Sequence, residues 1–326
     1  MNKTTEFLVD KKDIGIRIDI FLSKKIENLT RSYLKKLIEK KNLIINGRVI
    51  TSPSVKVKIN DKIIFKTVDK IETRLVANKI NIETVFEDKD ILVINKPKGM
   101  VVHPGSGNFQ NTLANALFYK YKNKLSNING NLRPGIVHRI DKETSGLLVV
   151  AKNNISHSKL GEQFGQHTIK RKYQCLVWGT IRPLNGRIET LIARSNKNRQ
   201  LMSVSENRGK KAITNYKTLK VFNLKDVPKI SLLECELETG RTHQIRVHLS
   251  YKGSPLLGDK QYGRKKLKFK KVNKKFIEIL DNIKGQVLHA QTLEFIHPTK
   301  NKWVSFSLEK PTEFKKLLKL LKNLNS

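Results

Sequence analysis

The sequence has few of the residues that cross-link small secreted folds or bind zinc. Only two cysteines, Cys175 and Cys235, occur among 326 residues, and they are far apart and outside any C-x-x-C pair. This spacing excludes a zinc ribbon and argues against a disulfide framework. We therefore expect a reduced, cytoplasmic protein.

Long apolar runs are also missing. No apolar stretch approaches the roughly 20 residues that a membrane-spanning helix requires. The N-terminal MNKTTEFLVDKKD carries acidic residues early and lacks the apolar core of a signal peptide. The amphipathic EFKKLLKLLKN near the end favours a docked helix over a membrane-surface segment. We expect no membrane partner.

Acidic residues are scarce relative to basic ones. The chain has 65 Lys plus Arg against 28 Asp plus Glu, a formal net charge of +37. Such an excess favours a polyanionic partner, most commonly nucleic acid, with anionic membrane as the competing possibility. Part of the excess needs no partner, because abundant Lys, Asn and Ile are also typical of an AT-rich genome. The length predicts two domains.

The first fifty or so residues with a clear pattern form a small basic module. Thr30 is a candidate N-cap for a helix over RSYLKKLIEKK, whose apolar residues share one face. The run LIINGRVI around Asn46-Gly47 predicts a tight hairpin, and VKVKINDKIIF alternates with period two and turns at Asn60-Asp61.

This module resembles the S4-like RNA-binding domain. The matching positions are Arg17, Asp19 and Leu22, then Ile45-Asn46-Gly47, Pro53-Ser54 and Asn60-Asp61. Asn42 and Asn60 stand where that family commonly has glycine, and asparagine tolerates the left-handed conformation well. The resemblance implies RNA contacts at Lys35, Lys36 and Arg48. A lysine-coated module without a ligand is the alternative.

The remainder predicts an α+β fold with mostly antiparallel strands. Residues 66–83 are charged and without a period, which indicates a linker, so we divide the chain into 1–75 (the S4-like module plus linker) and 76–326 (a larger domain). Strand-like runs then alternate with helical candidates near 112–124, 155–166 and 312–324. The lysine-rich RKKLKFKKVNKK at 264–275 reads as a solvated loop.

The stretch RPGIVHRIDKETSGLLVVAK contains one carboxylate in a suggestive place, Asp141. A kinase would also need a D-F-G segment and a glycine-rich phosphate loop, and neither is present. A glycosidase would need a second carboxylate in a separate role. A lone aspartate beside a fixed arginine stays ionised and suits a nucleophile or a base.

The stretch LETGRTHQIRVHL could supply that arginine. If it is an extended strand, Arg241 and Arg246 point to opposite faces, so that one meets a carboxylate and the other meets phosphate. The alternative is that both only neutralise surface acids.

The segments HRIDKETSGLLVVAK, KRKYQCLVWG, GRTHQIRVHL, SPLLGDKQYG and VLHAQTLEFIHP, in this order, resemble the RluA-type pseudouridine synthases. The likeness runs from Thr84 to about Pro311. It implies a small S4-like module followed by a mixed-sheet synthase domain that isomerises uridine in RNA without a metal or cofactor.

The resemblance also implies roles for individual residues. Asp141 matches the catalytic aspartate, Tyr173 matches the tyrosine that stacks on uracil and is a candidate for taking the C5 proton, and Arg246 matches the arginine that pairs with the aspartate. Arg139 matches the residue that replaces a flipped base. His138 and Arg241 are further expected RNA contacts.

The expected substrate is large-subunit ribosomal RNA or its assembly intermediate, in the stem-loop (helix 69) at the subunit interface, and the expected state is a monomer. Two alternatives stay open. One is a non-catalytic rRNA-binding assembly factor, and the other is a synthase acting on another rRNA site or on tRNA.

Overall fold

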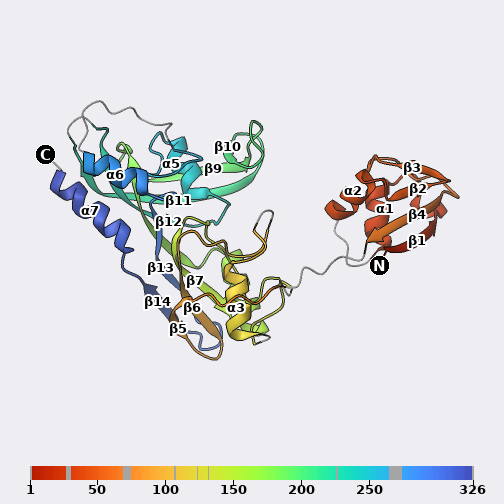
Figure 1. Ribbon diagram of the computed structural model, residues 1–326, viewed down its shortest axis with the longest axis horizontal. Coiled ribbons are helices and arrows are strands. Elements are labelled where there is room, and N and C mark those ends of the chain that lie inside the picture. The colour runs from red at the N-terminus through yellow and green to blue at the C-terminus, as the bar shows by residue number, and fades with distance from the viewer. Residues whose placement is uncertain are drawn as a thin grey trace. The chain divides into compact units, whose positions relative to one another are not determined.

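A computed structural model describes residues 2–26, 31–68, 75–105, 108–122, 124–130, 132–224, 227–263 and 274–324. The chain divides into two units, Met1–Arg74 and Leu75–Ser326. Figure 1 draws the first unit in red to orange and the second from orange through yellow and green to blue. Within the described residues, no helix is both long and apolar enough to cross a membrane.

The first unit is a four-stranded antiparallel sheet, ordered β1-β4-β2-β3, with two helices. Its elements are β1 (Asn2–Leu8), η1 (Lys11–Asp13), α1 (Ile18–Lys25), α2 (Arg31–Glu39), β2 (Leu43–Ile45), β3 (Arg48–Ile50) and β4 (Lys62–Val68). The hairpin turns at Asn46 and Gly47, both with positive φ, as the tight two-residue turn requires. Buried Asp19 binds Arg17 and Arg31 at about 3 Å, which ties the two helices together.

The second unit contains a ten-stranded sheet. Its helices are α3 (Leu113–Tyr121), α4 (Asn154–Gly165), α5 (Gln244–Tyr251), α6 (Lys274–Asn282) and α7 (Thr312–Leu324). Its strands are β5 (Glu83–Glu87), β6 (Ile91–Lys96), β7 (Ser145–Ala151), β8 (Lys170–Trp178), β9 (Asn185–Arg194), β10 (Met202–Ser205), β11 (Lys210–Phe222), β12 (Ile230–Leu237), β13 (Leu288–Ile296) and β14 (Trp303–Ser307).

The strand order is β10-β9-β11-β12-β8-β13-β7-β6-β5, with β14 added to β13. Every described strand pair is antiparallel except β13 with β7. The predicted α+β class with mostly antiparallel strands is confirmed, as is the position of the S4-like module before it. The late strand β13 thus joins β7 to β8 in the middle of the sheet.

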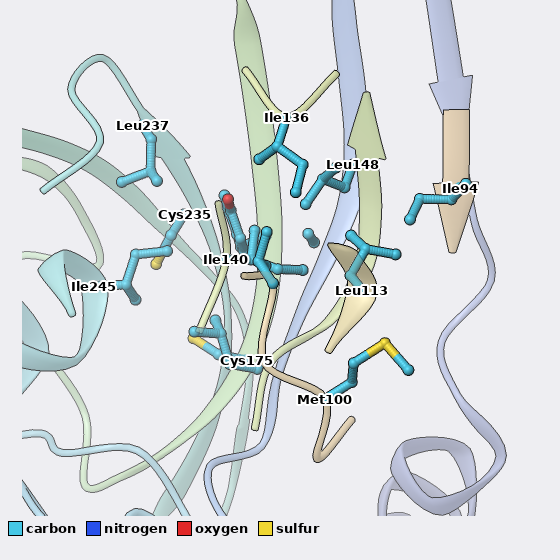
Figure 2. Close-up of a cluster of buried hydrophobic side chains, with 14 of the residues drawn as sticks. Ile94, Met100, Leu113, Ile136, Ile140, Leu148, Cys175, Cys235, Leu237 and Ile245 are labelled. Carbon is cyan, nitrogen blue, oxygen red and sulfur yellow. The ribbon is translucent and has the colours of Figure 1, made fainter. Parts of the chain in front are cut away.

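Alternation along β8 supplies both faces of the sheet with apolar side chains. Tyr173, Cys175 and Val177 belong to one buried cluster, and Leu176 and Trp178 belong to another that α6 and α7 cover. Figure 2 shows part of the first cluster, including Cys175 and Cys235 from neighbouring strands.

Several expectations about local structure were wrong. The stretch predicted as an extended strand around Arg241 is a turn followed by α5, because the Gln244 side chain accepts hydrogen bonds from Thr239 and from the Arg241 N–H at the helix start. Residues 55–59 form no strand, although Val57 is buried.

The linker at 66–83 was also too long. Strand β4 continues to Val68, and Leu75 is buried in the core of the second unit. Helix α6 begins at Lys274, inside the stretch expected as a loop. Asn42 and Asn60 were expected to take the left-handed conformation where the S4-like family has glycine. Asn60 has positive φ as expected, but in the turn before β2 the residue with positive φ is Lys41 and not Asn42. Thr30 and residues 264–273 lie outside the described residues.

Candidate active site

Asp141 lies in a loop that is fixed on both sides just before β7. Ile140 is buried in the core cluster shown in Figure 2. The Lys142 carbonyl oxygen accepts hydrogen bonds from the Gly99 N–H and from Nζ of buried Lys96. The Thr144 side chain accepts from Gln286. The aspartate is therefore presented by a rigid backbone, with its side chain partly exposed.

Arg246 faces Asp141 from α5. Its Nη1 lies 3.4 Å from Oδ2 of Asp141, but its closest partner is Asp259, which it binds through Nε at 2.7 Å and Nη2 at 2.9 Å. Gln261 accepts a further bond at 2.7 Å. Burial is the largest single influence and would raise the pKa of Asp259, but the hydrogen bonds and charge of Arg246, together with the N–H groups of Tyr262 and Gln261, hold that pKa below its ordinary value. Asp259 thus positions the guanidinium that reaches Asp141.

His243 and Tyr262 complete this side of the site. His243, at the N-cap of α5, has φ 57°, and its Nε2 is 4.0 Å from Oδ1 of Asp141. Nδ1 lies 2.8 Å from the Tyr262 hydroxyl, which accepts from the Met202 N–H. When Tyr262 donates its proton to Nδ1, His243 carries its own proton on Nε2, the nitrogen nearer Asp141. The Tyr262 ring lies 4.8 Å from the Arg246 guanidinium.

Asp141, Arg246 and Tyr173 line one cavity of about 260 Å³, together with Arg139, Arg171 and Arg241. A cavity of this size has room for a single-ring base. Tyr173 is buried on β8, and burial raises its pKa, so its phenol is protonated at neutral pH. That state favours a stacking surface over a proton acceptor.

The other expected RNA contacts of this domain also line the cavity. Arg139 is exposed, and its Nη1 lies 3.5 Å from Nε2 of His103. His138 stacks on Phe164 and accepts from the Val149 N–H, and burial lowers its pKa to about 3, so it is neutral. Arg241 donates to the Lys211 carbonyl. Arg241 and Arg246 thus border the same cavity, contrary to the opposite faces expected of a strand.

In the first unit, Lys35 and Lys36 project from α2 and Arg48 from β3, all exposed. These are the cations that the sequence assigned to RNA binding.

Asp259, Tyr262 and His243 were missed as site residues. They lie in segments that carry the family resemblance, but only the fold of α5 and of the turn after it brings them close to Arg246. Arg171 was missed too, although it stands two residues before Tyr173 and a strand places such residues on one face.

One group of metal-ligand types, Asp88, Asp90 and His297, occurs within the part of the chain that the structure describes. Its oxygens are already occupied by Lys300, Thr299, Asn153 and backbone N–H groups. This group reads as a structural polar network and not as a metal centre.

Comparison with known families gives two matches. The model for RNA pseudouridylate synthase matches residues 90–251, which contain Asp141, Tyr173 and Arg246. The S4 domain model matches residues 16–63.

Similar curated proteins extend over nearly the whole chain. The ribosomal large subunit pseudouridine synthase D of Zymomonas mobilis is 45% identical, over 98% of both chains. The protein of the same name from Haemophilus influenzae is 38% identical over 96% of this chain and 94% of its own. An uncharacterized RNA pseudouridine synthase of Bacillus subtilis, YlyB, is 39% identical over 94% of each chain.

Among solved structures, human RNA pseudouridylate synthase domain containing 4 is 24% identical with a TM-score of 0.57, covering 74% of this chain and 93% of its own. This likeness concerns the fold.

Proposed function

Because the chain belongs to the RNA pseudouridylate synthase family and is an RNA pseudouridine synthase, we propose that it isomerises uridines of large-subunit ribosomal RNA. The proposal includes the uridines of the stem-loop at the subunit interface, helix 69. Three relatives whose names specify the large subunit support this target. We propose a monomer that acts in the cytoplasm, on free ribosomal RNA or on an assembling subunit.

The observation that carries the proposal is the meeting of Asp141, Arg246 and Tyr173 around one cavity. In the reaction, the N1–C1′ bond of uridine breaks, the base turns, C5 bonds to C1′, C5 loses its proton and N1 gains one. Atoms balance without an external acceptor. Arg246 holds the Asp141 carboxylate in place from 3.4 Å, and Asp141 attacks C1′, attacks C6 of the ring, or removes the C2′ proton. Tyr173 stacks on the uracil.

The uridine must leave its helix or loop stack before it can enter the cavity, at a cost of a few kcal/mol. Arg139 is exposed at the cavity and near no acidic partner among the described residues, so it is suited to fill the vacated stack. His138 and Arg241 contact the flipped nucleotide. Residues 1–75, with Lys35, Lys36 and Arg48, bind the RNA backbone, and residues 76–326 carry out the chemistry.

The test uses transcribed ribosomal RNA with tritium at C5 of uracil. The full chain is expected to release tritium, and Asp141→Asn is expected to lower the rate at least about 1,000-fold, in line with loss of an essential nucleophile or base. No release by the full chain, or equal release by Asp141→Asn, would leave a non-catalytic RNA-binding factor as the better description.

The target is mapped by primer-extension stops after carbodiimide treatment. Stops within helix 69 support the proposed site, and stops only elsewhere in ribosomal RNA or only in tRNA contradict it. Addition of EDTA is expected to leave the rate unchanged.

A further inference from the structure

Arg171 is a buried cation without a counter-ion. Its side chain lies on β8 two residues before Tyr173, so both point to the same side of the sheet, and only 7% of its surface is exposed. Within the described part of the chain, no carboxylate lies within 4.0 Å of its guanidinium, and its Nε has no hydrogen-bond partner. Nη2 makes only long contacts of 3.5 and 3.4 Å to the carbonyls of Leu237 and Glu238.

The surroundings of Arg171 hold it at the cavity. Its guanidinium lies 5.5 Å from the Phe164 ring, and a Cβ on Gly240 would lie 2.7 Å from its Nη1. Glycine at 240 therefore leaves the space that the guanidinium occupies. Phe164, Gly240, Tyr173 and Arg171 itself all line the cavity that Asp141 borders.

The other buried cations of this domain are compensated. Arg246 binds Asp259, Asp141 and Gln261, and the Lys96 ammonium donates to three carbonyl oxygens. A buried charge without such partners costs several kcal/mol. A buried cation without a counter-ion destabilises the free protein, and such destabilising groups are typical of functional sites, where the substrate supplies the missing partner.

We propose that Arg171 is a further catalytic residue that donates hydrogen bonds to a carbonyl oxygen of the uracil and stabilises the negative charge that the base acquires during the isomerisation. The proposal rests on the function proposed above. It concerns the base and not a phosphate, because Arg171 is buried in the cavity beside Tyr173, the residue proposed to stack on the uracil.

The chemistry requires such a cation on each route open to Asp141. When the N1–C1′ bond breaks, its electron pair leaves with the uracil and spreads onto the carbonyl oxygens. C1′ then bonds to an Asp141 oxygen, or forms a double bond to C2′ if Asp141 has taken the C2′ proton. Attack of Asp141 on C6 instead moves a ring electron pair toward O4. The pair returns when C5 bonds to C1′. At that stage the bond from Asp141 to C1′ or C6 breaks, or Asp141 returns its proton to C2′ on the third route. C5 then loses its proton and N1 gains one. A cation in a dry pocket stabilises this transient charge strongly.

The experiment measures single-turnover rate and RNA affinity of Arg171→Met and Arg171→Lys in the full chain, on the RNA that the unaltered protein modifies. Arg187→Met is the matched control, because Arg187 is more exposed and pairs with Glu189 and Glu238. Arg171→Met is expected to slow the chemical step about 100- to 1,000-fold, as for loss of one donor to a developing anion. Its RNA affinity should change less than about threefold, Arg171→Lys should be intermediate, and the control should be unchanged.

Two further readouts separate catalysis from structure. The melting temperature of Arg171→Met should equal or exceed that of the unaltered protein, because a buried uncompensated charge is gone. Replacing the target by 5-fluorouridine, whose ring holds negative charge better, should reduce the effect of Arg171→Met about tenfold, as measured by loss of the nucleoside after nuclease digestion.

A normal rate in Arg171→Met would overturn the proposal. So would weakened RNA binding with normal chemistry, which indicates a phosphate contact, or a lower melting temperature with equal slowing of both nucleosides, which indicates a structural role. Failure of the unaltered protein to release tritium would instead refute the proposed function.

Discussion

At the scale of single residues, Arg246 contacts two carboxylates, and its hydrogen bonds to Asp259 are shorter than its contact with Asp141. Asp259 is fully buried and binds the guanidinium through two hydrogen bonds, whereas Asp141 is partly exposed and 3.4 Å away. The two aspartates should therefore respond differently to the same substitution.

Asp259→Asn is expected to lower the free energy of unfolding by about 3–5 kcal/mol, because it leaves a buried arginine without its main partner. Asp141→Asn should lower it by less than about 1 kcal/mol, since the lost pair is long and partly solvated. Urea denaturation of both variants measures the difference. Equal losses of unfolding free energy would mean that the pair between Arg246 and Asp141 also stabilises the fold.

A second prediction concerns Lys96, whose pKa burial lowers to about 7 from an ordinary 10.5. Between these values the unfolded chain holds a proton that the folded chain has lost, so the free energy of unfolding should rise with pH by up to about 1.4 kcal/mol per pH unit. Lys96→Met lacks this contribution. The free energy of unfolding relative to Lys96→Met, followed from about pH 7 to pH 10, should therefore increase, and parallel curves would contradict the prediction.

At the scale of elements, the join between β7 and β13 depends on a glycine. Gly146 has φ 118°, and a Cβ there would overlap the carbonyl oxygen of Ala290 on β13. Gly146→Ala is expected to destabilise the protein by about 3 kcal/mol or more.

The matched control is Gly161→Ala in α4, where a Cβ meets nothing within 4 Å. That change should stabilise by about 0.5–1 kcal/mol through the better helix propensity of alanine. Thermal unfolding of both variants distinguishes them. A tolerated Gly146→Ala would mean that the strand pair can separate without cost.

Helices and strands were predicted correctly from the sequence where a local pattern of apolar residues marks them. The helical candidates near 112–124, 155–166 and 312–324 correspond to α3, α4 and α7, and β6 to β8 were expected from strand-like apolar runs; the structure adds Thr112 and Asn153 as the N-caps of α3 and α4. Helix α5 was missed because Gln244, whose side chain accepts from Thr239 and the Arg241 N–H at the helix start, is held in that position by donating to Thr214 on the distant strand β11.

The same reasoning applies to the site. Asp141, Tyr173 and Arg246 were nominated by motif, and all three line one cavity, while their roles stay predictions. Asp259 and Arg171 could not be nominated by motif alone. Asp259 stands out because it pairs with Arg246, and Arg171 stands out because its Nε has no hydrogen-bond partner among the described residues. Both properties exist only in the folded chain.

At the scale of the whole molecule, the charge of +37 should appear in the salt dependence of RNA binding. Alanine at Lys35, Lys36 and Arg48 together is expected to weaken binding and to reduce the slope of log affinity against log salt by about 0.7 for each lost phosphate contact. The single-turnover rate at saturating RNA should stay unchanged.

The control replaces three exposed lysines of the second unit, Lys89, Lys217 and Lys302, by alanine, with the same loss of charge. Filter binding over a range of salt concentrations compares the two triple variants. Equal slopes would mean that total charge, and not the first unit, governs affinity.

The central position of β13 bears on when the enzyme becomes active during its own synthesis. The loop with Asp141 precedes β7, Tyr173 lies on β8, and β13 is the strand that bridges them, although it is translated more than a hundred residues after either. A nascent chain that ends before Leu288 lacks the strand that pairs with both β7 and β8. We therefore expect the active site to stay incomplete until β13 has been synthesised and has left the ribosome.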